Sequence, residues 1–206
     1  MMTGDSQIVL IDALQTAAAG ALLADAFFSD TLNSYVFPDP EERRRVLPWY
    51  FTASVLEGTL LNSAYATVGQ MRGVAVWTPP GLHERTPERA RQSGLDQMAV
   101  RFGPEAYRRF MEIIDHLEHV SSQVVPSDHW YLSLIGVSPL SQGQGIGGAL
   151  LTPVLQRADV EGISCYLETF EAKNLAFYQR HGFQVVATDT EPHSQLPFWA
   201  MRRDPV

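Results

Sequence analysis

Hydrophobic and polar residues recur with a helical period near the start of this chain. Within residues 13–28, four apolar positions lie four residues apart: Leu14, Ala18, Leu22 and Ala26. This spacing predicts an amphipathic helix. A second helix is predicted from the arginine-rich stretch at Glu41 through residues 49–56. The residues between the two helices, 30–40, are predicted to form turns.

From Thr59 the pattern becomes typical of β-strands. Residues 59–68 and 72–77 flank a Gly69-Gln70 turn, and prolines follow the second segment. This arrangement predicts an antiparallel hairpin. Residues 84–120 are charged with apolar insertions, as in helices that cover one face of a sheet.

The residues after Pro126 show the clearest succession of elements. The pattern predicts a strand at 130–137, a glycine-rich turn, a helix to about Glu161 that Pro153 should kink, and a strand at 164–169. A short helix at 174–181 and strands near 183–188 and 198–202 complete the prediction. No repeat or linker interrupts the chain, so residues 1–206 are predicted to form one α/β domain, a mixed sheet with helices on both faces.

Composition narrows the class of partner. The chain has 206 residues, 45% of them hydrophobic, and a formal net charge of -8. Such a charge does not attract a nucleic acid or an anionic membrane. The single cysteine, Cys165, excludes an internal disulfide and a multi-cysteine metal site, and fits the cytoplasm. Acidic residues surround the alanine-rich residues 16–28, which argues against a signal peptide, and no apolar run predicts a transmembrane helix.

A turn dense in glycine suggests a phosphate site between the strand at 130–137 and the following helix. Its candidate binding residues are Gln142, Gly143, Gly145, Gly147 and Gly148. Glycines leave backbone N–H groups uncovered at a helix N-terminus, where the helix dipole favours a diphosphate. The alternative is a tight turn in which the glycines serve backbone geometry alone.

Two other phosphate motifs compete with this interpretation. A P-loop requires Gly-Lys followed by Ser or Thr, and the turn has no lysine. Gly143, Gly145 and Gly148 satisfy a dinucleotide fingerprint, with Glu168 near the expected ribose-binding position. However, too little chain follows the turn to complete the second half of a dinucleotide domain.

Two sequence motifs, which follow one another along the chain, together resemble a known family. Gln-x-x-Gly-x-Gly begins at Gln142, and Asn-x-x-x-Tyr-x-x-x-Gly-Phe begins at Asn174. Together they resemble the acetyl-CoA-binding core of the GNAT superfamily of N-acetyltransferases. Residues 73–80, 136–139 and 167–169 further resemble puromycin N-acetyltransferase-like members. The similarity is good from about residue 129 to the end, moderate around Trp77 and poor over the first sixty residues.

The resemblance implies a GNAT fold and a set of cofactor contacts. The fold would be a central, mostly antiparallel mixed sheet splayed into a V, with the acetyl-CoA-binding core at about 129–206. Ile135 and Val137 would offer backbone groups to the pantetheine, and a backbone N–H near residues 134–136 would stabilise the oxyanion. Asn174 would bind the pantetheine, although asparagine also suits a helix N-cap.

The same resemblance points to two catalytic residues. Tyr178 is the expected general acid for the departing thiolate, the alternative being a packed helix tyrosine. Many relatives carry a glutamate where this chain has Tyr131, so a base on that strand is in doubt. Glu168 on the neighbouring strand is the remaining candidate for the base, through an ordered water, or else a glutamate at the rim.

The amine acceptor is harder to predict. Tyr35, Trp77 and Tyr131 are candidate substrate contacts, although aromatic residues beside a hairpin more often belong to the core. His116 and His119 are spaced as a metal pair on a helix, but no further ligands are nearby in sequence, so no metal is expected.

These inferences predict an enzyme that transfers the acetyl group of acetyl-CoA to the amine of a small molecule, without a covalent enzyme intermediate. A monomer or a homodimer is expected. The alternative is a non-catalytic acyl-CoA-binding or regulatory module that kept the cofactor cradle but lost the base.

Overall fold

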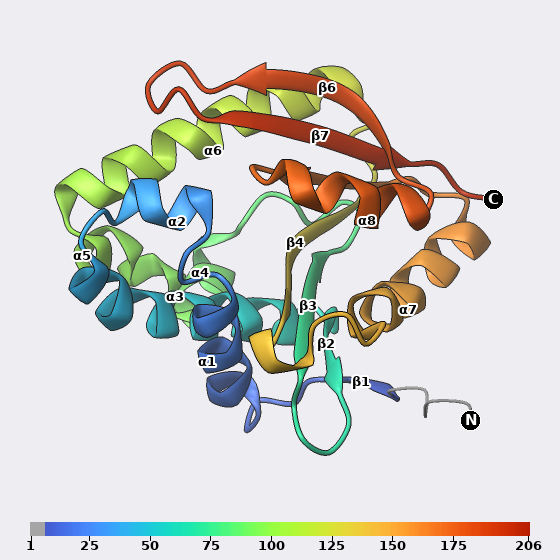
Figure 1. The fold of residues 1–206 in the computed structure, drawn as a ribbon, viewed down its shortest axis with the longest axis horizontal. Helices are drawn as coiled ribbons and strands as arrows, with labels where there is room; N and C mark the ends of the chain where they lie inside the picture. The colour runs from blue at the N-terminus through green and yellow to red at the C-terminus, as the bar shows by residue number, and fades with distance from the viewer. Residues whose placement is uncertain (1–6) are drawn as a thin grey trace.

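The computed structural model describes residues 7–206 and shows a seven-stranded sheet with helices on both faces (Figure 1). The strand order is β1-β2-β3-β4-β5-β7-β6, and the β4–β5 pair is the parallel one among otherwise antiparallel neighbours. The strands are β1 Ile8–Leu10, β2 Ala64–Thr67, β3 Gly73–Thr78, β4 Trp130–Val137, β5 Cys165–Thr169, β6 Gln184–Thr190 and β7 Pro197–Arg203. The mixed, mostly antiparallel fold class predicted from the sequence is confirmed.

The helices fall into two groups along the chain. Before β4 lie α1 Thr16–Ala26, α2 Thr31–Val36, α3 Pro40–Leu60, α4 Pro87–Ser93, α5 Met98–Phe102 and α6 Pro104–Val124. After β4 lie α7 Ile146–Glu161 and α8 Leu175–Arg180, and short 3-10 turns occupy 95–97, 139–141 and 172–174. None of the helices described in residues 7–206 is long and apolar enough to cross a bilayer.

Two sequence predictions in the first half were wrong. Residues 59–63 do not belong to a strand, because α3 continues to Leu60 and β2 begins at Ala64. The stretch 30–40, predicted as turns, contains α2. Its N-cap is Asp30, whose carboxylate accepts hydrogen bonds from the backbone N–H groups of Leu32 and Asn33 at 3.0 and 3.2 Å. The edge strand β1 was not predicted, because three residues are too short to show a period.

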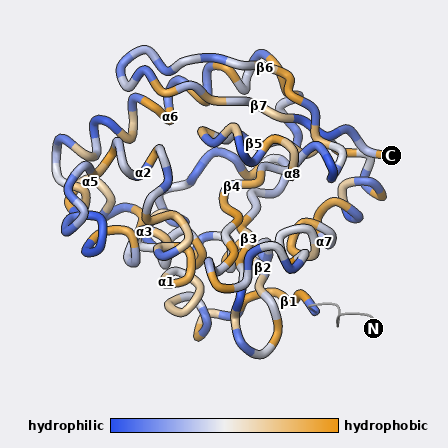
Figure 2. Tube along the Cα trace, in the orientation of Figure 1, coloured by the Kyte–Doolittle hydropathy of each residue, from blue (hydrophilic) through white to orange (hydrophobic). Residues whose placement is uncertain are grey.

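The core is divided by the sheet. One cluster of buried residues joins α1, α3, α5 and α6 to one face, and a second joins α7 and α8 to the other face. Figure 2 shows the hydrophobic colour concentrated along β3 and β4, whereas α6 alternates between hydrophobic and hydrophilic residues. A helix with such alternation packs one side on the sheet and exposes the other.

Two glycines allow the α1 helix to pack closely on its neighbours, one against the sheet and one against α3. A Cβ at Gly136 on β4 would lie 2.7 Å from the Leu23 side chain of α1. A Cβ at Gly20 would lie 2.2 Å from Oγ1 of Thr52 on α3. Because real side chains cannot approach so closely, Gly136 allows the short distance between α1 and β4, and Gly20 allows the short distance between α1 and α3.

The sheet opens between its two central parallel strands. β4 pairs with β5 at only two positions, Trp130 with Cys165 and Tyr131 with Tyr166. Beyond them the strands separate, and the register between β3 and β4 shifts at Val76/Trp77. A bulge of this kind bends a strand and increases its twist. The V-shaped split predicted for this sheet is therefore present, and it begins immediately after Tyr131.

A buried glutamate organises the connection between β6 and β7. Glu191 is fully buried, and its carboxylate accepts hydrogen bonds from the backbone N–H groups of His193 at 3.0 Å and Ser194 at 2.5 Å. Burial alone would raise the pKa of Glu191, but these hydrogen bonds outweigh it and lower the pKa to about 2. Glu191 is therefore a loop-stabilising residue.

We expect Glu191→Gln to lower the free energy of unfolding at pH 7 by about 1–3 kcal/mol, the range for hydrogen bonds to a charged group. Because the folded pKa lies below the ordinary value of 4.5, this stabilisation is present above that value and is lost as the pH falls towards 2. Urea unfolding of both proteins between pH 7 and pH 3 measures it. A difference that stays constant over this range would contradict the role of the charge.

Candidate active site

A cavity of about 780 Å³ opens where β4 and β5 separate. Its walls come from both strands, from α3 and α6, from the loop that follows β3, and from α8. Glu168, Tyr131, Tyr166, Asn174 and Tyr178 are among the residues that line it. The structure therefore brings together residues 131 and 178, which are far apart in the sequence.

Glu168 is the carboxylate at the splayed end of β5. Its side chain is half-buried, and its Oε2 is buried without a hydrogen-bond partner. Burial raises the pKa of Glu168 to about 7, although the nearby hydroxyl groups of Tyr166 and Tyr131 favour the ionised form. A carboxylate with a pKa near neutrality can accept and release a proton at physiological pH.

Tyr131 and Tyr166 lie side by side at the point where the strands separate. Their ring centroids are 6.2 Å apart, and the hydroxyl of Tyr166 is buried without a hydrogen-bond partner. Burial, together with the charge of Glu168, raises the pKa of both hydroxyls well above 10. Both tyrosines are therefore neutral near pH 7 and can act as hydrogen-bond donors.

Tyr178 is held by α8 beside the gap. The residue is 6% exposed, and its ring packs against Phe177 and Phe183. Burial, and to a smaller extent the charge of Asp30, raises the pKa of the Tyr178 hydroxyl. This hydroxyl therefore remains protonated near neutral pH and is available as a proton donor.

The glycine-rich turn ends at the N-terminus of α7. Gly145 is the N-cap with φ 79°, and Gly143 has φ 74°, a left-handed conformation that side chains disfavour. A Cβ at either position would meet no atom within 4 Å, so the surface above both residues is open. The first turn of α7 has no acidic residue. An anion can thus reach the free N–H groups at this end of the helix.

Gly147 and Gly148 have a packing role that the sequence did not reveal. A Cβ at Gly147 would lie 3.1 Å from the ring of Phe177, and a Cβ at Gly148 would lie 2.7 Å from Nε2 of His181. Both contacts are with α8 and the residue that follows it. These two glycines therefore allow α7 and α8 to pack, whatever their part in phosphate binding.

The polar residues predicted to contact the cofactor lie at the ends of elements. Nε2 of Gln142 donates to the carbonyl of Val137 at 3.4 Å, and the residue is exposed. Asn174 occupies the N-cap position of α8, but its side chain makes no capping bond and instead donates to Oγ1 of Thr169 at 3.4 Å. The side chains of Ile135 and Val137 pack on the α7 face of the sheet.

The three predicted acceptor residues are placed differently. Tyr131 lines the cavity. Trp77 borders it, but the residue is fully buried and its side chain belongs to the cluster on the α7 face. Tyr35 is not among the lining residues and packs from α2 against the other cluster. The structure thus brings Tyr131 to the cavity and leaves Trp77 and Tyr35 in packing positions.

The two histidines of α6 have separate partners. Nε2 of His116 lies 3.0 Å from Oδ2 of Asp189, and Nε2 of His119 lies 2.9 Å from Nε2 of Gln123. Each histidine is therefore engaged by its own neighbour.

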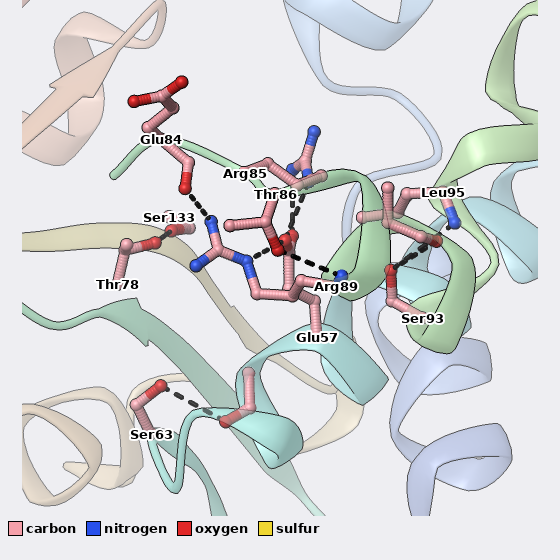
Figure 3. Close-up of polar contacts among 12 residues, drawn as sticks. Glu57, Ser63, Thr78, Glu84, Arg85, Thr86, Arg89, Ser93, Leu95 and Ser133 are labelled. Atoms are coloured by element: carbon pink, nitrogen blue, oxygen red, sulfur yellow. Dashed lines mark hydrogen bonds and ion pairs between the residues drawn. The ribbon is translucent and has the colours of Figure 1, made fainter. Parts of the chain in front are cut away.

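An ionic cluster in the cavity wall could not be predicted from the sequence. Arg85 donates from Nε and Nη2 to both carboxylate oxygens of Glu57 at 2.7 and 2.8 Å, and Nε of Arg89 donates to the same carboxylate at 3.0 Å (Figure 3). Glu57 comes from α3, whereas the arginines come from the loop after β3 and from α4. The cluster attaches this loop to α3. No local sequence signal links residues about thirty positions apart.

A stacked pair of histidines was also missed. The rings of His83 and His129 lie 4.2 Å apart, and Nε2 of His83 is 3.0 Å from the carbonyl oxygen of His129. Burial lowers the pKa of both imidazoles, so both are neutral at pH 7. Both line the cavity.

Solved structures share this fold along nearly the whole chain. One is described as histone acetyltransferase HPA2 and related acetyltransferase, from Corynebacterium glutamicum, with TM-score 0.66, 22% identity, and coverage of 97% of this chain and 96% of that chain. Another is arylalkylamine N-acetyltransferase 2 of Aedes aegypti, with TM-score 0.65, 12% identity, and coverage of 96% and 98%. Polyamine N-acetyltransferase of Drosophila melanogaster has TM-score 0.65, 14% identity, and coverage of 96% and 99%. At these identities the likeness concerns the fold alone.

Comparison of sequences identifies the family. An uncharacterized N-acetyltransferase of Schizosaccharomyces pombe is 28% identical over 207 residues, which cover 95% of this chain and 82% of the relative. The family model described as Acetyltransferase (GNAT) family matches residues 37–183, which include the glycine-rich turn, Glu168 and Tyr178. The match spans more than half of a chain that also has the splayed sheet, and the chain therefore belongs to the GNAT acetyltransferase family.

Proposed function

We propose that this protein transfers the acetyl group of acetyl-CoA directly to the amine of a small-molecule acceptor. One observation carries the proposal: Glu168 and Tyr178, from two elements beside the gap in the sheet, line the same cavity. A direct transfer requires one group to take a proton from the amine and another to give a proton to the leaving sulfur. The two residues meet this requirement.

The residues present fit a CoA molecule. The open surface over Gly143 and Gly145, at the N-terminus of α7, suits a diphosphate. Beyond Tyr131, the edge of β4 that faces β5 has no strand partner, so its backbone groups can bind an extended pantetheine arm. The Asn174 amide, which donates to Oγ1 of Thr169 on β5, also lines the cavity. Acetyl-CoA supplies the acetyl group as an activated thioester.

In the proposed reaction, Glu168 and Tyr178 each carry out one of the two proton transfers. Glu168 Oε2, which has no partner in the protein, accepts a proton from the acceptor nitrogen, directly or through a water molecule. A backbone N–H within residues 134–136 faces the negative charge that develops on the acetyl oxygen. The Tyr178 hydroxyl donates its proton to the sulfur. Oε2 of Glu168 and the residue Tyr178, which is 6% exposed, are both shielded from bulk water.

A non-catalytic acyl-CoA-binding module is the second candidate. Tyr131 in place of a strand glutamate favours it, whereas the shared cavity of Glu168 and Tyr178 favours the enzyme. Release of free thiol from acetyl-CoA in the presence of a panel of amines separates the two. Tight CoA binding without thiol release for any amine would favour the module.

We expect calorimetry to show micromolar binding of acetyl-CoA and none of NAD, and saturation with the ligand to raise the unfolding temperature. Gln142→Glu should weaken binding about tenfold, because it adds a negative charge where the diphosphate is expected. Gln142 is exposed and has ordinary backbone geometry, so its replacement avoids the strain of changing Gly145.

Gln156→Glu is the matched control for this prediction. Gln156 is exposed on α7 but lies far from its N-terminus, so the same change of charge should leave CoA binding unaltered. Equal effects of both replacements would place the diphosphate elsewhere. Tight NAD binding together with no CoA binding would overturn the proposed function.

A further inference from the structure

The charges around the cavity are unequal. Six carboxylates are among its lining residues: Asp30, Glu57, Glu84, Asp96, Glu118 and Glu168. Arg85 is the one arginine or lysine among the lining residues of the described chain, and the lining histidines His83 and His129 are neutral at pH 7. A cavity lined by one sign of charge concentrates ligands of the opposite sign. The cavity is thus suited to a cation.

Two buried atoms at the splayed end of the cavity need partners. The Tyr166 hydroxyl and Oε2 of Glu168 are shielded from solvent and make no hydrogen bond, and Tyr166 is 1% exposed. Unpaired buried polar atoms are costly, so a ligand that pairs with them gains affinity. A primary ammonium carries three N–H donors and can serve both oxygen atoms.

The other carboxylates are less able to bind a second ammonium group. Glu57 already accepts three hydrogen bonds from Arg85 and Arg89, and the two guanidinium charges more than balance its own charge. Asp30 caps α2 through the backbone of Leu32 and Asn33. The remaining three, Glu84, Asp96 and Glu118, are exposed, so each adds only a small attraction for a cation, which salt screens.

The part of the wall along α3 and α6 is mostly aromatic and apolar. Tyr50 of α3 and Phe110 of α6 contact each other edge to face with ring centroids 5.7 Å apart, and Tyr107, Met111 and Ile114 continue this surface along α6. Aromatic and methionine side chains favour an apolar or aromatic ligand body. The cavity of about 780 Å³ also receives the pantetheine arm beside Asn174 and Tyr178, so the part that remains for the body of the acceptor lies along α3 and α6.

We propose that the cavity selects a primary monoamine with an apolar, aromatic body and binds it as the ammonium ion. This inference rests on the proposed function, and it defines the class of acceptor and its charge when bound. The ammonium group lies against Glu168 and Tyr166, and the body lies against α3 and α6. Glu168 then receives the proton from an ammonium ion already in place.

Binding of three probes to the protein saturated with CoA tests this proposal without any turnover. The probes are 2-phenylethylamine, its neutral isostere 2-phenylethanol, and 1,4-diaminobutane. At pH 7 we expect calorimetry to give 2-phenylethylamine a Kd about tenfold or more below those of both others, because only it has both the charge and the aromatic body. Its advantage over the alcohol should shrink as salt is raised.

Two replacements on α6 separate the contributions. Glu118→Gln should weaken binding of 2-phenylethylamine about threefold and leave 2-phenylethanol unchanged, because it removes one cavity charge. Met111→Gln should weaken both aromatic probes, because it makes the apolar wall polar. Asp115→Asn is the control: it removes an exposed charge from the same helix outside the cavity lining and should change nothing.

Each of three binding results would contradict a different part of the proposal. Equal affinity for the alcohol would show that the charge is not recognised, and equal or tighter binding of 1,4-diaminobutane would show that the apolar body is not. Binding of none of the three probes would exclude this class of acceptor. Transfer of acetyl to other amines would then leave the proposed function intact, whereas selective binding of 2-phenylethylamine without thiol release would contradict the proposed function alone.

Discussion

Replacing Tyr178 with phenylalanine should lower kcat by about 10²-fold or more, the usual contribution of a general acid. The replacement removes one hydroxyl from a residue that is 6% exposed and leaves its ring contacts with Phe177 and Phe183 in place. CoA affinity should therefore stay within a few-fold of the wild type. Steady-state kinetics with saturating acetyl-CoA and calorimetry with CoA measure the two effects.

The expected loss of kcat follows from the protonation state of the buried Tyr178 hydroxyl. Because burial raises the pKa of Tyr178, its hydroxyl stays protonated at neutral pH, and the thiolate that leaves CoA, with a thiol pKa of about 8.5, needs a proton donor in the same cavity. Tyr65→Phe is the control, since Tyr65 lies on β2 outside the cavity lining. If Tyr178→Phe keeps the wild-type rate of a single turnover, Tyr178 serves only in packing.

Glu168→Gln should depress kcat/KM strongly at pH 7, by about 10²-fold if Glu168 is the general base. The replacement keeps the size of the side chain, and CoA binding should remain intact. Since the pKa of Glu168 is raised to about 7, the wild-type activity should fall as the pH drops below this value, because the base becomes protonated. The variant should lack this limb of the pH profile.

The acceptor amine can titrate as well, and the two effects must be separated. An amine with a pKa of about 10 is mostly protonated at pH 7, and an enzyme that uses only its neutral fraction becomes more active as the pH rises. That behaviour would appear in both proteins, with a profile that follows the pKa of each acceptor. Two acceptors of different pKa, measured with wild type, Glu168→Gln and the lining control Glu118→Gln, distinguish these cases.

A wild-type profile that follows the amine alone would remove Glu168 from the catalytic residues. A small loss in Glu168→Gln with the limb near pH 7 retained would make Glu168 a rim residue. A limb that is present in wild type and in Glu118→Gln but absent in Glu168→Gln would assign the titration to Glu168 itself.

The sequence alone determined most of the second half of the fold. β4 occupies residues 130–137 and α7 ends at Glu161, both as predicted, and Pro153 lies inside α7. These elements carry local signals: β-branched and aromatic runs, glycines at a helix start, and a glycine after its end. The same local signals predicted the glycine-rich turn and the helix that carries Tyr178.

Prediction was weaker where local signals conflict or are short. Residues 59 and 60 were predicted to lie in a strand but belong to α3, because tertiary packing overrides the β-propensity of a few positions. Asp30 before Thr31 is an N-cap that could have revealed α2, since its carboxylate bonds to the next turn.

Only the tertiary structure decided the character of the site. It joined Glu57 to Arg85 and Arg89, paired His83 with His129, and buried Glu168 so that its pKa is raised to about 7. It also showed that Trp77 is a core residue and that Gly147 and Gly148 allow α7 to pack against α8 and His181. The physical reason is that burial and charge pairing depend on residues far apart in the chain, whereas helical and strand periods are properties of neighbours.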